Sequence, residues 1–163
     1  MLKFLVVVNY CTASLNETFQ EKMDLIRAKI KKSDEDGDIV FFVEDEIMNI
    51  TGMDGKARAL EELKLLKKEL HADTNITTAR GVGATLLQPS MWLVARDCGM
   101  PDEIEFIGAY LDTNILANTL MTKSEFYKRK ISVDMSLCVT SDESLSTLNA
   151  VKRIFAVNGI EMK

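Results

Sequence analysis

Short apolar segments alternate along the chain with longer segments whose apolar residues repeat at helical spacing. Two of the short segments, residues 3–8 and 39–43, are continuous runs of β-branched and other apolar residues, which is typical of strands covered on both faces. Strands are predicted at residues 3–8, 39–43, 75–79, 104–107 and 160–162, and a further strand is predicted to begin at residues 131–133.

The longer segments predict helices with one apolar face each. The first helix follows Ser14 and Glu17, which have the spacing of a capping box. Pro89 and Gly99 stand where those residue types favour the start and the end of a later helix. Helices are predicted after the capping box and over residues 60–70, 89–98, 112–122 and 141–159.

Strands and helices alternate in this way along the whole chain. The alternation predicts an α/β fold of three layers, α/β/α, with a mostly parallel sheet of about six strands in a Rossmann-like order. No linker rich in Pro, Gly or Ser, no repeat and no low-complexity segment interrupts the pattern. Residues 1–163 are therefore expected to form one domain.

The charge balance narrows the classes of partner. The 163 residues carry 25 Asp and Glu against 20 Lys and Arg, a net charge of −5. A protein that reads nucleic acid through its phosphates needs a basic face, so no nucleic-acid partner is expected. No apolar run approaches the roughly 18 residues that span a bilayer. Residues 1–8 are too short for a signal peptide and lack a cleavage site, so no membrane partner is expected.

Neither the cysteines nor the glycines indicate a cofactor. Cys11, Cys98 and Cys138 are an odd number without metal-ligand spacing, which suggests reduced thiols in a cytoplasm. The loop at residues 81–83 lacks the third glycine and the Lys-Ser/Thr pair of phosphate-binding loops, so it is interpreted as a tight turn. We therefore expect no cofactor.

In parallel sheets, ligands bind beyond the carboxyl ends of the strands. Cys11 is the thiol best placed there, although a cysteine in such a position is more often a small buried apolar side chain. The single histidine, His71, lies at a helix end, where a cation is favoured, and this argues against a histidine-based triad. The candidate ligand-binding residues at the carboxyl ends of the predicted strands are Asn9, Tyr10, Cys11, Thr12, Glu44, Asp45, Glu46, residues 80–85 and residues 108–114.

The sequence resembles the isochorismatase-like cysteine hydrolases, the family that includes the nicotinamidases. Residues 5–11, Leu-Val-Val-Val-Asn-Tyr-Cys, are similar to the family's opening strand and its Asp-x-Gln. Residues 104–118 resemble the family's next conserved strand, followed by Gly, Thr/Ser-Asp/Asn-x-Cys-Val and a helix. Residues 131–136 resemble the strand after that. The resemblance covers nearly the whole chain and implies a three-layer α/β/α domain that commonly forms oligomers.

The resemblance implies a reaction in which a thiolate attacks an amide or related carbonyl carbon. A carboxylate takes the thiol proton and a lysine stabilises the charges between them. The matching positions here are Asn9 for the carboxylate, Asn114 for the cysteine, and Arg80 in the stretch that should supply the lysine. A carboxamide neither accepts a proton at neutral pH nor acts as a nucleophile, and arginine cannot share a proton as lysine can. No catalytic residue is therefore expected.

A metal site is not expected either. In family members that bind a metal, the ligands follow the second strand as Asp-x-His. Glu44 and Glu46 have that spacing, and carboxylates can hold a hard cation. The further histidine expected downstream has no counterpart, and adjacent carboxylates on one loop are more often simply solvated.

The sequence thus predicts a non-catalytic isochorismatase-like protein that acts as a small-molecule binder or as an interaction subunit. The expected ligand is a small aromatic carboxamide or acid, and the expected assembly is a homo-oligomer. One alternative is that the pocket has drifted and filled with side chains. The other is a hydrolase with Cys11 as a relocated nucleophile and Glu44 or Asp112 as its base. The predicted pocket comprises Asn9, Cys11, Glu44, Arg80, Leu111, Asp112 and Asn114.

Overall fold

Strand β1 (Lys3–Val8) lies in the middle of the sheet, between β2 (Ile39–Asp45) and β4 (Glu103–Ala109). All six residues of β1 are apolar except Lys3, and residues 4–8 are buried, as expected of a strand with helices on both faces. Val8, its last residue, pairs with Val43 of β2 and with Gly108 of β4. The computed structural model describes residues 1–15, 17–45, 53–71, 75–79 and 86–163.

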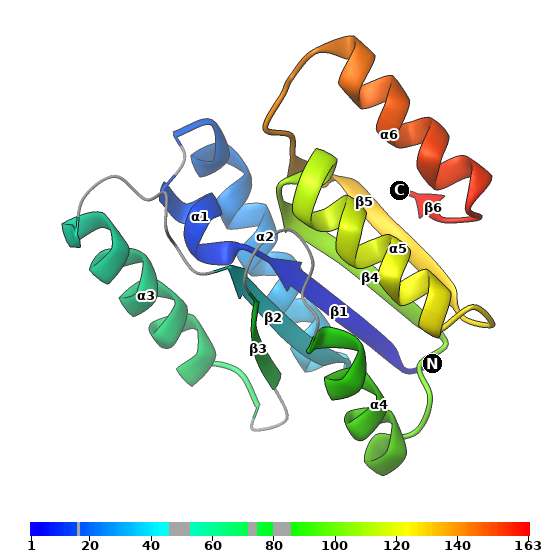
Figure 1. Ribbon diagram of the computed structural model, residues 1–163. Coiled ribbons are helices and arrows are strands. Elements are labelled where there is room, and N and C mark those ends of the chain that lie inside the picture. The colour runs from blue at the N-terminus through cyan, green and yellow to red at the C-terminus, as the bar shows by residue number, and fades with distance from the viewer. Residues whose placement is uncertain (16, 46–52, 72–74, 80–85) are drawn as a thin grey trace.

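Three further strands extend the sheet. β3 (Asn75–Ala79) pairs with β2, while β5 (Lys130–Val139) and the two-residue β6 (Glu161–Met162) continue it beyond β4. The order is β3-β2-β1-β4-β5-β6, and every neighbouring pair is parallel (Figure 1). The sheet therefore has five strands of substantial length and a short sixth at its edge, which confirms the predicted parallel α/β fold.

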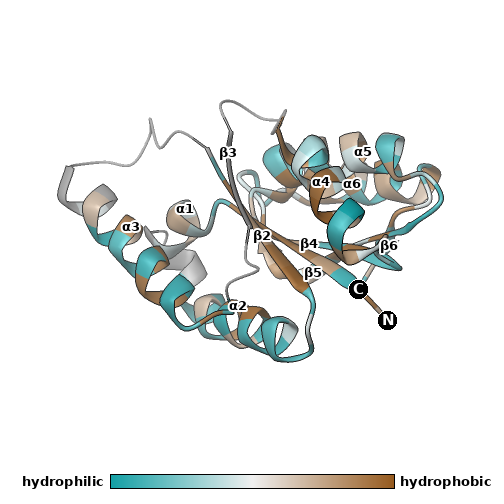
Figure 2. Ribbon diagram, turned by 90° about the horizontal axis from the view of Figure 1, so that it is seen from below, coloured by the Kyte–Doolittle hydropathy of each residue, from teal (hydrophilic) through white to brown (hydrophobic). Residues whose placement is uncertain are grey.

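Helices cover both faces of the sheet, so that the molecule has three layers (Figure 2). Alternate residues of β1 explain this, because Leu5 and Val7 belong to one apolar core while Phe4 and Val6 belong to the other. None of the described helices is long and apolar enough to cross a membrane. The core that contains Leu5 and Val7 lies under α1 (Tyr10–Leu15), α2 (Glu17–Glu35) and α3 (Met53–Lys68). The core that contains Phe4 and Val6 lies under α4 (Leu87–Cys98), α5 (Leu116–Glu125) and α6 (Leu145–Val157).

The segment after β1 differs from the prediction. The sequence predicts that the first helix begins after the capping box of Ser14 and Glu17, but a separate helix, α1, already forms directly after Asn9. The N–H of Ala13 donates to the carbonyl of Asn9 at 2.9 Å, which starts the helix there. Ser14 lies inside α1 and its hydroxyl donates to the carbonyl of Cys11 at 2.9 Å, so Ser14 does not begin α2.

Two other boundaries also differ. The predicted helix over residues 112–122 is divided into a π-helical turn, η1 (Leu111–Ile115), and α5. The last helix begins at Leu145, with Ser144 as its cap, because the Ser144 hydroxyl accepts the N–H of Thr147 at 3.3 Å. Ser141, the predicted cap, instead donates to Asp112.

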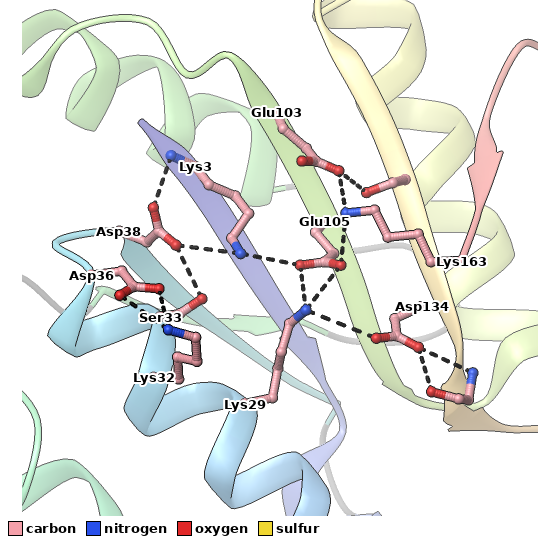
Figure 3. Close-up of polar contacts among 12 residues, drawn as sticks. Lys3, Lys29, Lys32, Ser33, Asp36, Asp38, Glu103, Glu105, Asp134 and Lys163 are labelled. Atoms are coloured by element: carbon pink, nitrogen blue, oxygen red, sulfur yellow. Dashed lines mark hydrogen bonds and ion pairs between the residues drawn. The ribbon is translucent and has the colours of Figure 1, made fainter. Parts of the chain in front are cut away.

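The strand predicted to begin at residues 131–133 continues in β5 to Val139, because Cys138 and Val139 still pair with Gly108 and Ala109 of β4. A network of charges lies on the α2 side of the sheet. Glu105 of β4 is fully buried at the centre of this network (Figure 3). Its carboxylate lies 3.0 Å from the ammonium of Lys29, 3.0 Å from that of Lys163 and 3.4 Å from that of Lys3. Asp134 of β5 reaches Lys29 as well, at 3.8 Å.

Candidate functional site

Asn9 occupies the turn from β1 into α1. Its side chain is 2% exposed and its φ is +54°, in the left-handed region that asparagine tolerates better than most residues. The backbone N–H of Asn9 donates to the carbonyl of Val43 at 2.7 Å. Asn9 is therefore fixed between the carboxyl ends of β1 and β2, where the sequence places it.

Asn114 lies in η1, just after the neighbouring strand β4, and is 7% exposed. Its side-chain oxygen accepts a hydrogen bond from the hydroxyl of Thr113 at 3.0 Å. Its backbone carbonyl accepts one from the side-chain amide of Asn118 at 2.7 Å. The carboxamide of Asn114 is thus held by the neighbouring residue of its own turn, and its backbone by the helix that follows.

The strand ends that precede Asn9 and Asn114 are in close contact. Val8 pairs with Gly108, and a Cβ atom on Gly108 would lie 2.0 Å from the Val8 carbonyl oxygen. Only glycine permits this approach, and its φ of +114° also favours glycine. The structure therefore brings the two asparagine-bearing segments to adjacent ends of the sheet, as the parallel strand order predicts.

Cys11 and Glu44 lie together beside Asn9. The carboxylate oxygens of Glu44 lie 3.1 and 3.2 Å from the backbone nitrogen of Cys11, and both side chains are buried. The thiol of Cys11 points to the carbonyl of Ala59 in α3, 3.6 Å away. Burial raises the pKa of the Cys11 thiol, and the Glu44 carboxylate raises it further. The thiol is therefore protonated at neutral pH, which is the opposite of an activated nucleophile.

Asp112 and Leu111 face a different part of the molecule from Cys11. The carboxylate of Asp112 accepts the N–H and the hydroxyl of Ser141, at 2.8 and 2.6 Å, and the N–H of Asp142 at 3.2 Å. Burial alone would raise the pKa of Asp112, but these hydrogen bonds outweigh it and lower the pKa. Leu111 lines a cavity at the end of β5. Asp112 thus anchors the loop before α6, a role that the sequence analysis did not predict.

Arg80, Glu46 and the glycine loop at residues 81–83 lie outside the described residues. Within the described part of the chain, no three His, Cys, Asp or Glu side chains are grouped as metal ligands would be. His71 lies just after α3, where its Nδ1 is 2.6 Å from the Asp34 carboxylate at the end of α2. This contact joins two helices at the surface and is far along the chain from the asparagines.

The sequence analysis selects Thr113 only as one member of the segment 108–114 and misses Asn118. Both act on Asn114, one through a side-chain hydroxyl and the other across one helical turn. The spacing of Asn118, four residues after Asn114, is the signal that could have identified it, because such residues share a helix face. Chemically, the described groups can donate and accept hydrogen bonds, and the burial of Cys11 keeps its thiol in the protonated form.

Solved structures match the chain although no family model and no curated protein does. The nicotinamidase of Bacillus subtilis superposes with a TM-score of 0.73 at 17% identity, over 99% of each chain. That of Staphylococcus aureus gives 0.70 at 18% identity, over 99% of this chain and 98% of the other. An isochorismatase family protein from Desulfovibrio vulgaris gives 0.66 at 11% identity, over 98% and 92%.

Identities this low establish the fold and no more. The similarity extends over essentially the whole length of both chains, and it includes nicotinamidases as well as an isochorismatase family protein. The chain therefore has the isochorismatase-like fold, as the resemblance of its segments predicted.

Proposed function

From this fold, we propose that the protein binds a small aromatic carboxamide or acid at the carboxyl ends of β1 and β4 without hydrolysing it. The observation that carries the proposal is the pair of buried asparagines, Asn9 and Asn114, at adjacent strand ends. By the family resemblance these are the positions of the proton acceptor and the nucleophile. Loss of both groups removes about 6 kcal/mol or more of transition-state stabilisation.

The chemistry of the ligand follows from the chemistry of asparagine. A carboxamide carries two donors and one acceptor oxygen, and these are complementary to the amide or carboxyl group of a small aromatic ligand. The nicotinamidases with the same fold act, by their names, on a molecule of this class. The protein would keep the recognition of such a ligand and lack the groups for its hydrolysis.

Isothermal titration of the full chain with nicotinamide, pyrazinamide and nicotinate tests binding, and an ammonia-release assay with the two amides tests turnover. We expect saturable heat with at least one of the three and no ammonia above the background. Ammonia release that scales with protein concentration would overturn the proposal. Absence of heat at millimolar ligand would overturn it as well and would favour the alternative in which side chains fill the pocket.

A pair of matched variants localises the ligand. Asn114→Ala removes the candidate carboxamide and should lower the affinity about tenfold, as expected for loss of a buried hydrogen-bonding group. Asn149→Ala makes the same change on the exposed face of α6 and should have no effect on binding. Equal affinities of the two variants would place the ligand elsewhere.

A hydrolase with Cys11 as its nucleophile is the second candidate. The Glu44 carboxylate favours it, because it accepts the backbone N–H of Cys11 and lies close enough to the thiol to raise its pKa. A carboxylate beside a thiol is the arrangement that a general base needs. Its test is the same ammonia assay, in which activity that disappears in Cys11→Ser and persists in Cys98→Ser would establish this function. The raised pKa of the Cys11 thiol argues against it.

An interaction or assembly subunit is the third candidate. Five large apolar side chains are exposed on or beside α4 and α5: Leu86, Trp92, Leu93, Met121 and Tyr127. Trp92 lines one surface hollow together with Met121 and another together with Tyr127, and contiguous exposed apolar surface is typical of interaction sites. Sedimentation velocity over a range of concentrations tests self-association, with Leu93→Lys expected to disrupt a homo-oligomer and Leu25→Lys, exposed on α2, as the control.

We also propose a reducing compartment, such as the cytoplasm, as the setting of this function. All three cysteines are free thiols, and Cys98 is exposed. An exposed thiol persists where the redox potential is low.

A further inference from the structure

A cavity of about 380 Å³ lies at the carboxyl end of β5. Side chains from both helix layers reach it, because Lys22 comes from α2 while Leu148 and Lys152 come from α6. The end of a parallel strand is where ligands bind in sheets of this kind, and the volume lies within the range of small-molecule sites. Neither Asn9 nor Asn114 lines this cavity, although Leu111 belongs to the same π-helical turn as Asn114.

The walls of the cavity are aliphatic. Leu111, Met135, Val139 and Leu148 supply branched or flexible apolar surface, and the buried thiol of Cys138 adds to it. Burial raises the pKa of the Cys138 thiol, so it remains neutral at physiological pH and behaves as a small apolar group. A ligand with an aliphatic body would bury its surface here.

Two cations and one anion stand at the rim. The Lys22 ammonium donates to the carbonyl of Cys138 at 3.0 Å, which uses one of its three N–H donors. Lys152 and Glu143 are the other charged lining residues, and both are exposed. The lining therefore carries one net positive charge, although the whole chain has a net charge of −5. This sign favours an anionic head group.

The wall formed by the loop before α6 is held in place by hydrogen bonds. Asp112 fixes Ser141 and Asp142, as described above. Asp142 in turn accepts the N–H and the hydroxyl of Ser144, both at 2.9 Å, at the start of α6. The loop that contributes Thr140 and Glu143 is thus preorganised, which lowers the entropy lost on binding.

We propose that this cavity is a binding site for an aliphatic carboxylate, with the chain of the ligand against the leucines and Met135 and its carboxylate between Lys22 and Lys152. Octanoate is the probe. Octanoate has ten heavy atoms. At the binding free energy per heavy atom of ordinary small-molecule sites, this corresponds to a Kd on the order of 1 mM. The inference concerns a second site and does not depend on carboxamide binding at the asparagines.

The experiment is a titration of the full chain, labelled with ¹³C at the methionine methyl groups, monitored by NMR. Octanoate should shift the Met135 methyl signal in a saturable way and leave that of Met121, exposed on α5, in place. The neutral isostere octanamide should bind about tenfold more weakly, because it lacks the charge that the lysines recognise. No Met135 shift at roughly 20 mM octanoate, twentyfold above that Kd, would overturn the proposal.

Two neighbouring variants on α6 separate the site from nonspecific charge effects. Lys152→Gln removes a rim cation on an exposed position and should weaken octanoate about fivefold while octanamide is unaffected. Arg153→Gln makes the same change of charge one residue later, outside the cavity lining, and should leave both affinities as they are. Equal weakening in both variants, or equal affinity for the two probes, would contradict carboxylate recognition here.

Discussion

The Glu44 carboxylate reaches the backbone N–H of Cys11 with both of its oxygens, at 3.1 and 3.2 Å. The contact joins the end of β2 to the first turn of α1, across 33 residues of chain. It stabilises the backbone beside Asn9, and it also places a negative charge next to the thiol. A single carboxylate therefore helps to build the site and suppresses ionisation of its cysteine.

Stability should fall at alkaline pH because of the buried thiols. The pKa of Cys11 and that of Cys138 are raised in the folded protein, chiefly by burial, so the folded state retains protons that the unfolded state releases. The stabilisation is complete below the unfolded pKa of about 8.5 and is lost as the pH rises above it, by up to about 1.4 kcal/mol per pH unit for each thiol. Urea unfolding from pH 7 to 10 measures this slope.

Cysteine variants identify the source of the slope. Cys11→Ala should make it shallower, whereas Cys98→Ala, at an exposed position, should leave it unchanged. A slope that is the same in all three proteins would contradict the assignment to buried thiols.

Glu105→Gln should lower the free energy of unfolding by about 2 kcal/mol. The change removes the buried partner of three lysines, and the loss is below the 3–5 kcal/mol of a fully buried pair because the lysines keep contact with water. Glu61→Gln, at an exposed position of α3, is the control and should change stability by less than about 0.5 kcal/mol. Chemical denaturation at pH 7 compares the two.

The same residue predicts an acid-dependent part of the stability. Burial alone would raise the pKa of Glu105, but hydrogen bonds from Lys29 and Lys163 outweigh it and lower the pKa. The contribution is thus present above the unfolded value of about 4.3 and is lost as the pH falls through the lower folded pKa. The acid limb of the stability curve should be shallower in Glu105→Gln, and parallel limbs would show that Glu105 does not titrate in this way.

Gly108→Ala should prevent normal folding or cost more than about 3 kcal/mol, because the new Cβ would overlap the Val8 carbonyl and the backbone is in the left-handed region. Gly159→Ala, where φ is +62° but nothing lies within 4 Å, should cost only about 1 kcal/mol. Soluble yield and thermal melting compare the two. Similar melting temperatures would mean that β1 and β4 are not in such close contact.

The fluorescence of the single tryptophan should report the contact between α4 and α5. Trp92 stacks on Phe126 with ring centroids 4.7 Å apart and an interplanar angle of 20°, although 44% of its surface is exposed. Phe126→Leu should shift its emission to longer wavelength by adding water contact. Phe155→Leu changes a buried core residue of α6. It should destabilise the protein comparably without shifting the emission maximum of the native state.

The central strands were predictable because each is an apolar run with a local signal, and their Rossmann-like order follows from the alternation of strands and helices. β1 and β3 have the residues that the pattern indicates, and the positions of Asn9 and Asn114 at strand ends follow from that order. The charge network beside β5 was not predictable in this way. Asp134 of β5 and Glu105 of β4 share Lys29 of α2, and Glu105 also pairs with Lys163, so these partners are far apart in the sequence and no local pattern reveals them.

The role of Asp112 shows the same limit at the level of the site. Its place in the sequence, two residues before Asn114, suggests a group that acts on the pocket. Its hydrogen-bond partner Ser141 is 29 residues away and belongs to a loop whose course depends on where β5 ends. A side chain that serves a distant loop cannot be distinguished, from the sequence alone, from one that serves its neighbours.

The central position of β1 has a consequence for biosynthesis. β1 leaves the ribosome before the other strands of the sheet and can pair with β2 soon afterwards, but the edge that pairs with β4 must wait for residues 103–109. Until then the nascent chain presents an apolar strand with open hydrogen-bonding groups, which is a template for aggregation. Slower translation between β3 and β4 prolongs that exposure. Chaperones that bind exposed apolar segments should therefore raise the yield of native protein when they are coexpressed.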